Sequence, residues 1–158
     1  MGLVIEPHDP SAPEVVALLE AHLALMRATS PPGHVHALDI EGLTQPDITF
    51  FAARSDDRIL GVGAVRYLGA GHGEIKSMHT AEAARGMGIG RALVEHLIAL
   101  ASERGWQRLS LETGTMDTFA PAHRLYESMG FRQCEPFGDY TVNQYSLCMT
   151  LDLTRTVG

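Results

Sequence analysis

The stretch RGMGIGRALVEHL, Arg85 to Leu97, places three glycines within five residues and then continues as an apolar segment that favours a helix. Glycine costs a helix interior roughly 1 kcal/mol relative to alanine. The first N–H groups of a helix have no partner inside it, and the helix dipole puts partial positive charge at the same end. Because glycine lets the backbone approach a phosphate closely and adopt positive φ, the stretch predicts a phosphate-binding turn.

Two common phosphate-binding motifs do not fit this turn. A P-loop reads G-x-x-x-x-G-K-[ST], and no lysine follows the glycines here. The dinucleotide fingerprint reads G-x-G-x-x-G, whereas the spacing here is G-x-G-x-G with an arginine ahead of it. Arg85 and Arg91 flank the turn and offer charge-assisted contacts to phosphates. We therefore expect the nucleotide to bind in a different fold.

Apolar periodicity and turn residues predict an α/β domain that spans residues 1–158, with an antiparallel first half and a βαβ unit in the second. The expected elements are a strand at 3–6, a helix capped by Ser11 and stopped at 30–33, a short helix at 37–43, strands at 48–54, 59–68 and 71–80, a helix after the glycines, a strand at 107–113, a helix at 120–129 and a strand at 144–153. Alternation along the strand at 71–80 places Glu74, Lys76 and Met78 on one face, with Ile75, Ser77 and His79 on the other.

Composition excludes several classes of protein. The formal net charge of −7 and a single lysine, Lys76, argue against binding to nucleic acid. No apolar run approaches the ~20 residues that span a bilayer, and the N-terminus does not resemble a signal peptide. Cys134 and Cys148 match neither a redox pair nor a zinc site. We expect a cytoplasmic protein with no metal, no membrane and no nucleic-acid partner.

Three motifs together carry a family resemblance. The run from Arg85 to Gly90 resembles the R/Q-x-x-G-x-G/A pyrophosphate motif of the GNAT superfamily of acyl-CoA-dependent N-acetyltransferases. GEIKSMHT, at 73–80, resembles the fourth strand of that family, and AHRLYESMGF, at 122–131, resembles its A-x-x-L-Y-x-x-x-G-F signature. The match covers roughly 48–153. It implies a mixed, mostly antiparallel sheet that is flanked by helices and splayed between its fourth and fifth strands.

The resemblance also implies the cosubstrate and how it binds. Acetyl-CoA would lie in the splay, with its pyrophosphate on the glycine turn, and a backbone N–H near Met78 would polarise the thioester carbonyl. The family often has an asparagine where this chain has Phe119, so a threonine, Thr113 or Thr115, is expected to replace its contact with the CoA arm. The implied cofactor-binding residues are Met78, Thr80, Arg85, Gly86, Met87, Gly88, Ile89, Gly90, Arg91 and Thr113.

Two residues match catalytic positions of the family. Tyr126 matches the tyrosine near the thioester sulfur, where a phenol can protonate the leaving thiolate; the alternative is a buried ring that packs on Phe131. Glu74 matches a frequent general base that acts through water; the alternative is a carboxylate of the strand ladder. His79 and His72 are rival bases, because histidine titrates near neutral pH.

The acceptor is the least determined part. Lys76 shares a face with Glu74, so it either pairs with that carboxylate or binds a carboxylate of the substrate, and we place Lys76 and His79 in the substrate site. GEIK and LETG, the latter at 111–114, resemble a bacterial subgroup assigned to amino acids or small carboxylated molecules. We expect a small amine acceptor, a protein or peptide amine being the alternative, with specificity in 21–43 and 137–144. The alternative to an enzyme is a non-catalytic protein that binds acyl-CoA as a sensor. A homodimer is a family-level expectation.

Overall fold

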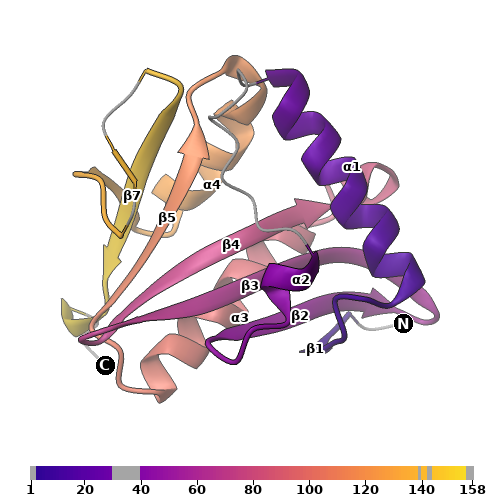
Figure 1. Cartoon of the computed structure of the whole chain (residues 1–158), viewed down its shortest axis with the longest axis horizontal. Coiled ribbons are helices and arrows are strands. Elements are labelled where there is room, and N and C mark those ends of the chain that lie inside the picture. The colour runs from indigo at the N-terminus through magenta and orange to yellow at the C-terminus, as the bar shows by residue number, and fades with distance from the viewer. Residues whose placement is uncertain (1–2, 30–39, 139, 142–143, 156–158) are drawn as a thin grey trace.

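The computed structural model describes residues 3–29, 40–138, 140–141 and 144–155 (Figure 1). The strands are β1 (Val4–Pro7), β2 (Ile48–Ser55), β3 (Arg58–Gly69), β4 (His72–Thr80), β5 (Arg108–Gly114), β6 (Arg132–Cys134) and β7 (Ser146–Asp152). The helices are α1 (Pro13–Thr29), α2 (Ile40–Leu43), α3 (Ile89–Glu103) and α4 (Ala120–Ser128), with short 3₁₀ turns at Glu82–Ala84, Asp117–Phe119 and Leu153–Arg155. No helix in these ranges is long and apolar enough to cross a membrane.

The strands form one mixed sheet in the order β1-β2-β3-β4-β5-β7-β6. All neighbours pair antiparallel except β4 and β5, which are parallel. Their pairing runs only from His72 opposite Arg108 to Ile75 opposite Leu111, although β4 continues to Thr80. The two strands then diverge (Figure 1). The mixed sheet and the splay expected from the sequence are therefore confirmed.

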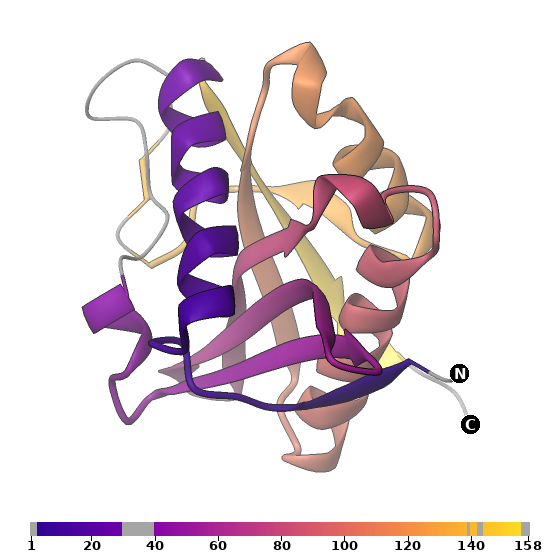
Figure 2. The ribbon, with the colours of Figure 1, turned by 90° about the vertical axis from the view of Figure 1, so that its right-hand side faces the viewer.

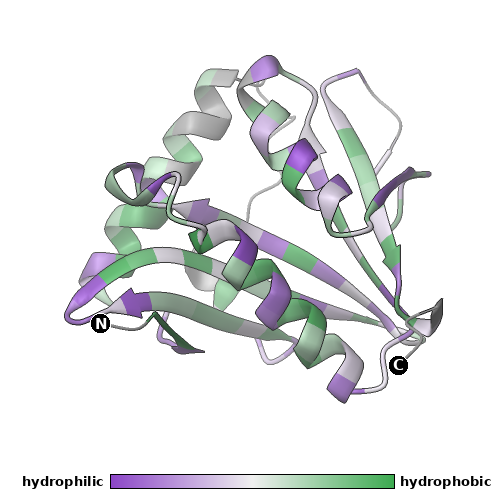
Figure 3. Ribbon diagram, turned by 180° about the vertical axis from the view of Figure 1, so that it is seen from behind, coloured by the Kyte–Doolittle hydropathy of each residue, from purple (hydrophilic) through white to green (hydrophobic). Residues whose placement is uncertain are grey.

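Helices cover both faces of the sheet, with α1 and α2 on one face and α3 and α4 on the other (Figure 2). Beneath α1, a buried cluster joins Val15 and Leu19 to Val62 and Ala64 of β3. Beneath α3 and α4, a larger cluster joins helix and sheet residues such as Leu97, Leu109 and Phe131. The apolar stripe of α3 faces this cluster, and hydrophilic residues alternate with it along the helix (Figure 3).

Two details differ from the sequence prediction. Ser11 does not cap α1 with its side chain, because its hydroxyl and its N–H both donate to the Asp9 carboxylate, at 2.7 and 2.9 Å. Strand β6 was not expected, since its three residues form a short edge strand with exposed Arg132 and Gln133 and therefore carry no apolar pattern. Helix α2 falls inside the predicted helix at 37–43, of which 37–39 lie outside the described residues.

A β-bulge in β4 changes the faces of the residues that follow it. Val62 lies opposite His79, and Ala64 opposite Lys76, so Ser77 and Met78 together oppose a single residue of β3. Ser77 takes the positive φ of 58°. The prediction that His79 faces away from Glu74 is therefore wrong: the extra residue shifts the alternation by one, and His79 lies on the face of Glu74 and Lys76. Met78 instead packs against the same cluster as Ile75.

Candidate active site

The glycine turn adopts the backbone that its sequence predicts. Gly86 and Gly88 have φ of +83° and +79°, and a Cβ built on either would meet nothing within 4 Å. Their absent side chains therefore serve the backbone conformation rather than packing. Gly88 is the N-cap of α3, and without a side chain it gives the first N–H groups of that helix no capping oxygen. At Gly90 the glycine instead serves packing, since a Cβ built there would lie 3.4 Å from the Leu125 side chain of α4.

A cavity of about 690 Å³ opens at this helix N-terminus, between the end of β4, the glycine turn and α4. The residues predicted to bind the cofactor that line it are Met78, Thr80, Arg85, Gly86, Gly88, Ile89, Gly90 and Arg91. Two others do not: Met87 is 64% exposed, and Thr113 is buried in β5. Most of the predicted cofactor residues are thus brought together around one cavity.

The two arginines of the turn differ in their contacts. Arg91, in the first turn of α3, donates from Nη2 to the Ser128 hydroxyl at 2.8 Å and so links α3 to α4. Arg85 is exposed and lines the cavity. Burial lowers the pKa of His79, and the charge of Arg85 lowers it further. Both effects favour a neutral imidazole beside the turn.

Tyr126 lines the cavity from α4 and is 6% exposed. Its ring also makes an edge contact with Phe131, with centroids 5.7 Å apart. Tyr126 therefore both packs on Phe131 and forms part of the cavity wall. Burial raises the pKa of Tyr126 to about 12.

Phe119 adds an apolar wall to the same cavity, where the family often has asparagine. A Cβ on Gly114 would lie 2.4 Å from its ring, so the last residue of β5 has to be small to accept it. The sequence analysis identified Phe119 only as a departure from the family pattern and did not predict its packing on Gly114.

On the opposite face of the sheet, Glu74 forms a buried triangle with Lys76 and Tyr140. Tyr140 donates to Glu74 Oε2 at 2.5 Å, and Lys76 Nζ lies 3.2 Å from the same oxygen and 3.0 Å from the Tyr140 hydroxyl. Glu74 is 4% and Lys76 9% exposed. The ion pair between Lys76 and Glu74 is therefore present. Burial, followed by the Glu74 charge, raises the pKa of Tyr140 far above its ordinary value.

Tyr140 was not singled out from the sequence, although it falls in the segment 137–144 that was expected to set acceptor specificity. Part of both specificity segments, namely 30–39, 139 and 142–143, lies outside the described residues. His72, one of the rival bases, sits at the start of β4, where its Nε2 is 2.7 Å from the Ser110 hydroxyl. It is six residues before Met78, so it lies away from the cavity.

The two faces meet at the splay. The cavity and Tyr126 lie on the α3 and α4 side, and Glu74 and Lys76 lie on the α1 side. His79 shares the face of Glu74 by register and also lines the cavity. Beyond Ile75, β5 no longer pairs with β4, which opens the sheet between the two sides. Such an arrangement lets an anionic cosubstrate enter from one face and a second reactant reach it from the other.

Comparison with known proteins agrees with this geometry. Residues 15–131 match the model of the acetyltransferase (GNAT) family. The chain is 45% identical to the uncharacterised N-acetyltransferase YsnE of Bacillus subtilis (strain 168), over 94% of this chain and 99% of that protein. It is 35% identical to an IAA acetyltransferase of Azospirillum brasilense, over 94% of this chain and 96% of that protein.

The fold is also that of a GNAT family acetyltransferase from Elizabethkingia anophelis, solved with acetyl-CoA bound. The TM-score is 0.70 at 20% identity, with 95% of this chain and 97% of the other covered. The family match covers most of the chain, and the two curated relatives match it almost from end to end. This chain is an acetyltransferase and belongs to the GNAT family.

Proposed function

We propose that this enzyme transfers the acetyl group of acetyl-CoA to the primary amine of a small, carboxylated metabolite. The amine attacks the thioester directly in a ternary complex, without an acetyl-enzyme. The observation that carries the proposal is the splay, with an anion-binding turn and Tyr126 on one side and Glu74 on the other. The acetyl-CoA bound to the Elizabethkingia structure, which shares this fold, supports the choice of cosubstrate.

The glycine turn binds the pyrophosphate through backbone N–H groups between Arg85 and Arg91. The free N–H groups and the dipole of α3 favour the negative charge, and Arg85 adds a charge-assisted contact. Past the splay, backbone groups of Met78 and Thr80 bind the pantetheine arm. One N–H near Met78 polarises the thioester carbonyl and stabilises the oxyanion that develops on it, which is commonly a large electrostatic contribution.

Tyr126 stabilises the leaving thiolate of CoA. With a pKa of about 12 its hydroxyl stays protonated throughout the neutral range. An ordinary thiol has a pKa of about 8.5, so complete proton transfer from this phenol to the thiolate is uphill. The phenol therefore acts first as a hydrogen-bond donor to the sulfur, and the final proton comes from solvent.

Glu74 is the general base and takes the proton of the attacking amine through a water molecule. Lys76, beside it, binds the carboxylate of the acceptor, and His79 contacts the acceptor from the same face. The buried ion pair and the hydroxyl of Tyr140 fix the Glu74 carboxylate. An acceptor that carries both an amine and a carboxylate would match the two charges of the pair.

The test of this function is acetyl-CoA-dependent release of free thiol against amino acids, polyamines, aminoglycosides and short peptides. We expect turnover with acceptors that carry a carboxylate near the amine, and an Arg85→Ala enzyme with a raised KM for acetyl-CoA. Arg58→Gln, at the exposed first residue of β3, is the matched control and should behave as wild type. Turnover only on peptides would overturn the acceptor class. Binding of acetyl-CoA without turnover on any amine would favour a sensor.

A Tyr126→Phe enzyme should lose about tenfold in kcat, as expected for the loss of one hydrogen bond of about 1.4 kcal/mol in the transition state, with little change in KM for acetyl-CoA. The ring and its packing on Phe131 remain, so the fold should be retained. Steady-state kinetics with the preferred amine, alongside thermal melting, measure both effects. An unchanged kcat would remove Tyr126 from the mechanism and leave it as a packing residue.

A further inference from the structure

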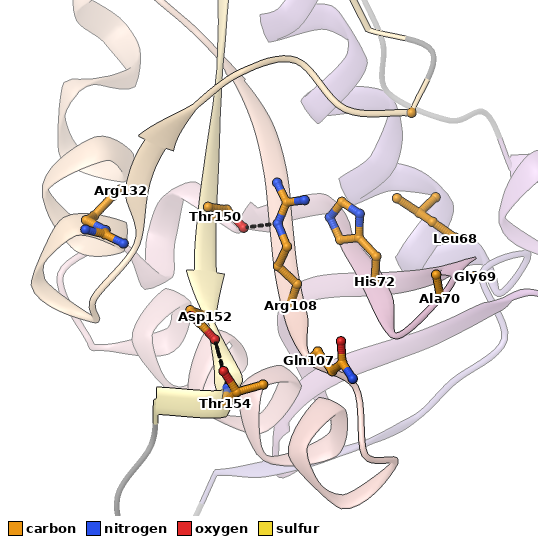
Figure 4. Close-up of a pocket in the computed structure, with 11 residues that line it drawn as sticks. Leu68, Gly69, Ala70, His72, Gln107, Arg108, Arg132, Thr150, Asp152 and Thr154 are labelled. Atoms are coloured by element: carbon orange, nitrogen blue, oxygen red, sulfur yellow. Dashed lines mark hydrogen bonds between the residues drawn. The ribbon is translucent and has the colours of Figure 1, made fainter.

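A second cavity, of about 670 Å³, lies at the opposite end of β4 and β5 (Figure 4). It is lined by the turn between β3 and β4, the first residues of β4 and β5, and β7. None of the described residues lines both this cavity and the one at the glycine turn. His72 here and Met78 there are six residues apart on β4, which corresponds to about 20 Å of strand. The second cavity is therefore a separate site, of a size that suits a small metabolite.

A polar chain across three strands forms the floor of this cavity. Arg108 Nε donates to the Thr150 hydroxyl at 2.9 Å. The Thr150 hydroxyl lies 2.8 Å from the Ser110 hydroxyl. The Ser110 hydroxyl in turn lies 2.7 Å from His72 Nε2. Ser110 is fully buried. The bond through Nε fixes the plane of the guanidinium and leaves its two terminal nitrogens as the donors for other partners. Figure 4 shows this guanidinium beside the His72 ring.

Asp152 lies opposite Arg108 in the pairing of β5 with β7. Among the residues that the structure describes, no carboxylate lies within ion-pair distance of Arg108. The Arg108 side chain also hydrogen-bonds to the thiol of Cys134, which is only a weak acceptor. The acid on the cavity wall, Asp152, accepts at Oδ1 from the N–H and the hydroxyl of Thr154.

Two further observations support a positive interior. Arg132 of β6 lines the same cavity and adds a second charge. The pKa of His72 is lowered by burial and also by the charge of Arg108, which lies beside the ring in Figure 4. The terminal N–H groups of a planar guanidinium match the two oxygens of a carboxylate or a phosphate.

We propose that this cavity binds a small molecule through a carboxylate or phosphate group, held between the Arg108 guanidinium and the His72 ring, with Arg132 at its rim. The site shares no lining residue with the acetyl-CoA cavity. It lies on the same strand as the proposed acceptor residues, with His72 two residues before Glu74. It therefore gives the enzyme a place for a ligand other than the cosubstrate.

The experiment is calorimetric titration of the full chain with inorganic phosphate and, separately, with succinate. The protein is first saturated with CoA, because the glycine turn is itself an anion site. We expect saturable binding of at least one of the two anions, weakened at least tenfold in Arg108→Gln and severalfold in Arg132→Gln. Tighter binding of phosphate or of succinate identifies the ligand group as a phosphate or a carboxylate. Arg58→Gln removes an exposed arginine outside the cavity and should bind as wild type.

Two controls keep the outcome decisive. Arg132 is exposed, so Arg132→Gln remains folded even if the loss of half-buried Arg108 weakens the fold. A shift of the His72 ring resonances in NMR spectra, absent in a His72→Gln protein, should accompany binding in the CoA-saturated enzyme. Absence of saturable binding to wild type, or binding that neither arginine variant weakens, would overturn the proposal.

Discussion

A Gly88→Val enzyme is expected to bind acetyl-CoA at least 100-fold more weakly than wild type. Gly88 has φ of +79°, a conformation that costs an ordinary L-residue roughly 1–2 kcal/mol and a β-branched residue more. Relaxation of this strain would turn away the N–H groups that we propose bind the pyrophosphate. Each hydrogen bond to a charged group contributes about 1.5–3 kcal/mol, so the loss of one or two of them gives this magnitude.

The chain supplies a matched control in Gly105, at the other end of α3. It has a similar φ of +74°, and a Cβ built on it also meets nothing within 4 Å, so Gly105→Val carries comparable backbone strain. We expect both variants to lose similar thermal stability, while only Gly88→Val loses affinity in calorimetric titration with acetyl-CoA. Normal binding by Gly88→Val, or equal losses in both variants, would mean that the turn does not hold the pyrophosphate.

The glycine turn and the elements around it could be predicted because their signals are local. Positive φ at Gly86 and Gly88 follows from the freedom of glycine, and the stripe of α3 follows from a period of 3.6 residues. The splay between β4 and β5 came from the family resemblance, not from residue patterns. Strand alternation alone does not reveal where two parallel strands stop pairing.

The bulge in β4 shows what local patterns miss. A period-two alternation assigns faces correctly only when each residue of a strand opposes one residue of its neighbour. At Ser77 and Met78 this fails, and the space for the Met78 side chain exists because its partner in β3 is glycine: a Cβ on Gly63 would lie 2.5 Å from Met78 Sδ. The face of His79 is thus decided by a residue 16 positions earlier in the chain.

Tyr140 could not be predicted for a related reason. It reaches Glu74 across 66 residues of sequence, from the loop between β6 and β7, and an isolated tyrosine in a polar loop carries no periodic signal. Of the candidate site, the part built from consecutive residues was therefore accessible from sequence. The part built by a loop folding over the sheet was not.

A Glu74→Gln enzyme should lose about 100-fold in kcat/KM at pH 7, the lower end of what a general base contributes. Glutamine keeps the shape of the side chain and can still accept the Tyr140 hydroxyl, but it cannot take a proton. Because an alkyl amine has a pKa near 10, an increasing share of the acceptor is already neutral as pH rises. The deficit of the variant should therefore shrink towards pH 10, and kcat/KM across pH 6–10 measures this.

Stability has to be separated from catalysis in this comparison, because Glu74→Gln leaves the buried ammonium of Lys76 without its carboxylate. The double variant Glu74→Gln with Lys76→Met removes both charges, and we expect it to recover thermal stability but not turnover.

Lys76→Met alone should raise KM only for carboxylated acceptors. A Tyr140→Phe enzyme, which keeps the carboxylate and loses one hydrogen bond to it, should lose only a fewfold in kcat. A pH-independent deficit that disappears in the double variant would show that Glu74 only supports the fold, and the role of base would then pass to His79 on the same face.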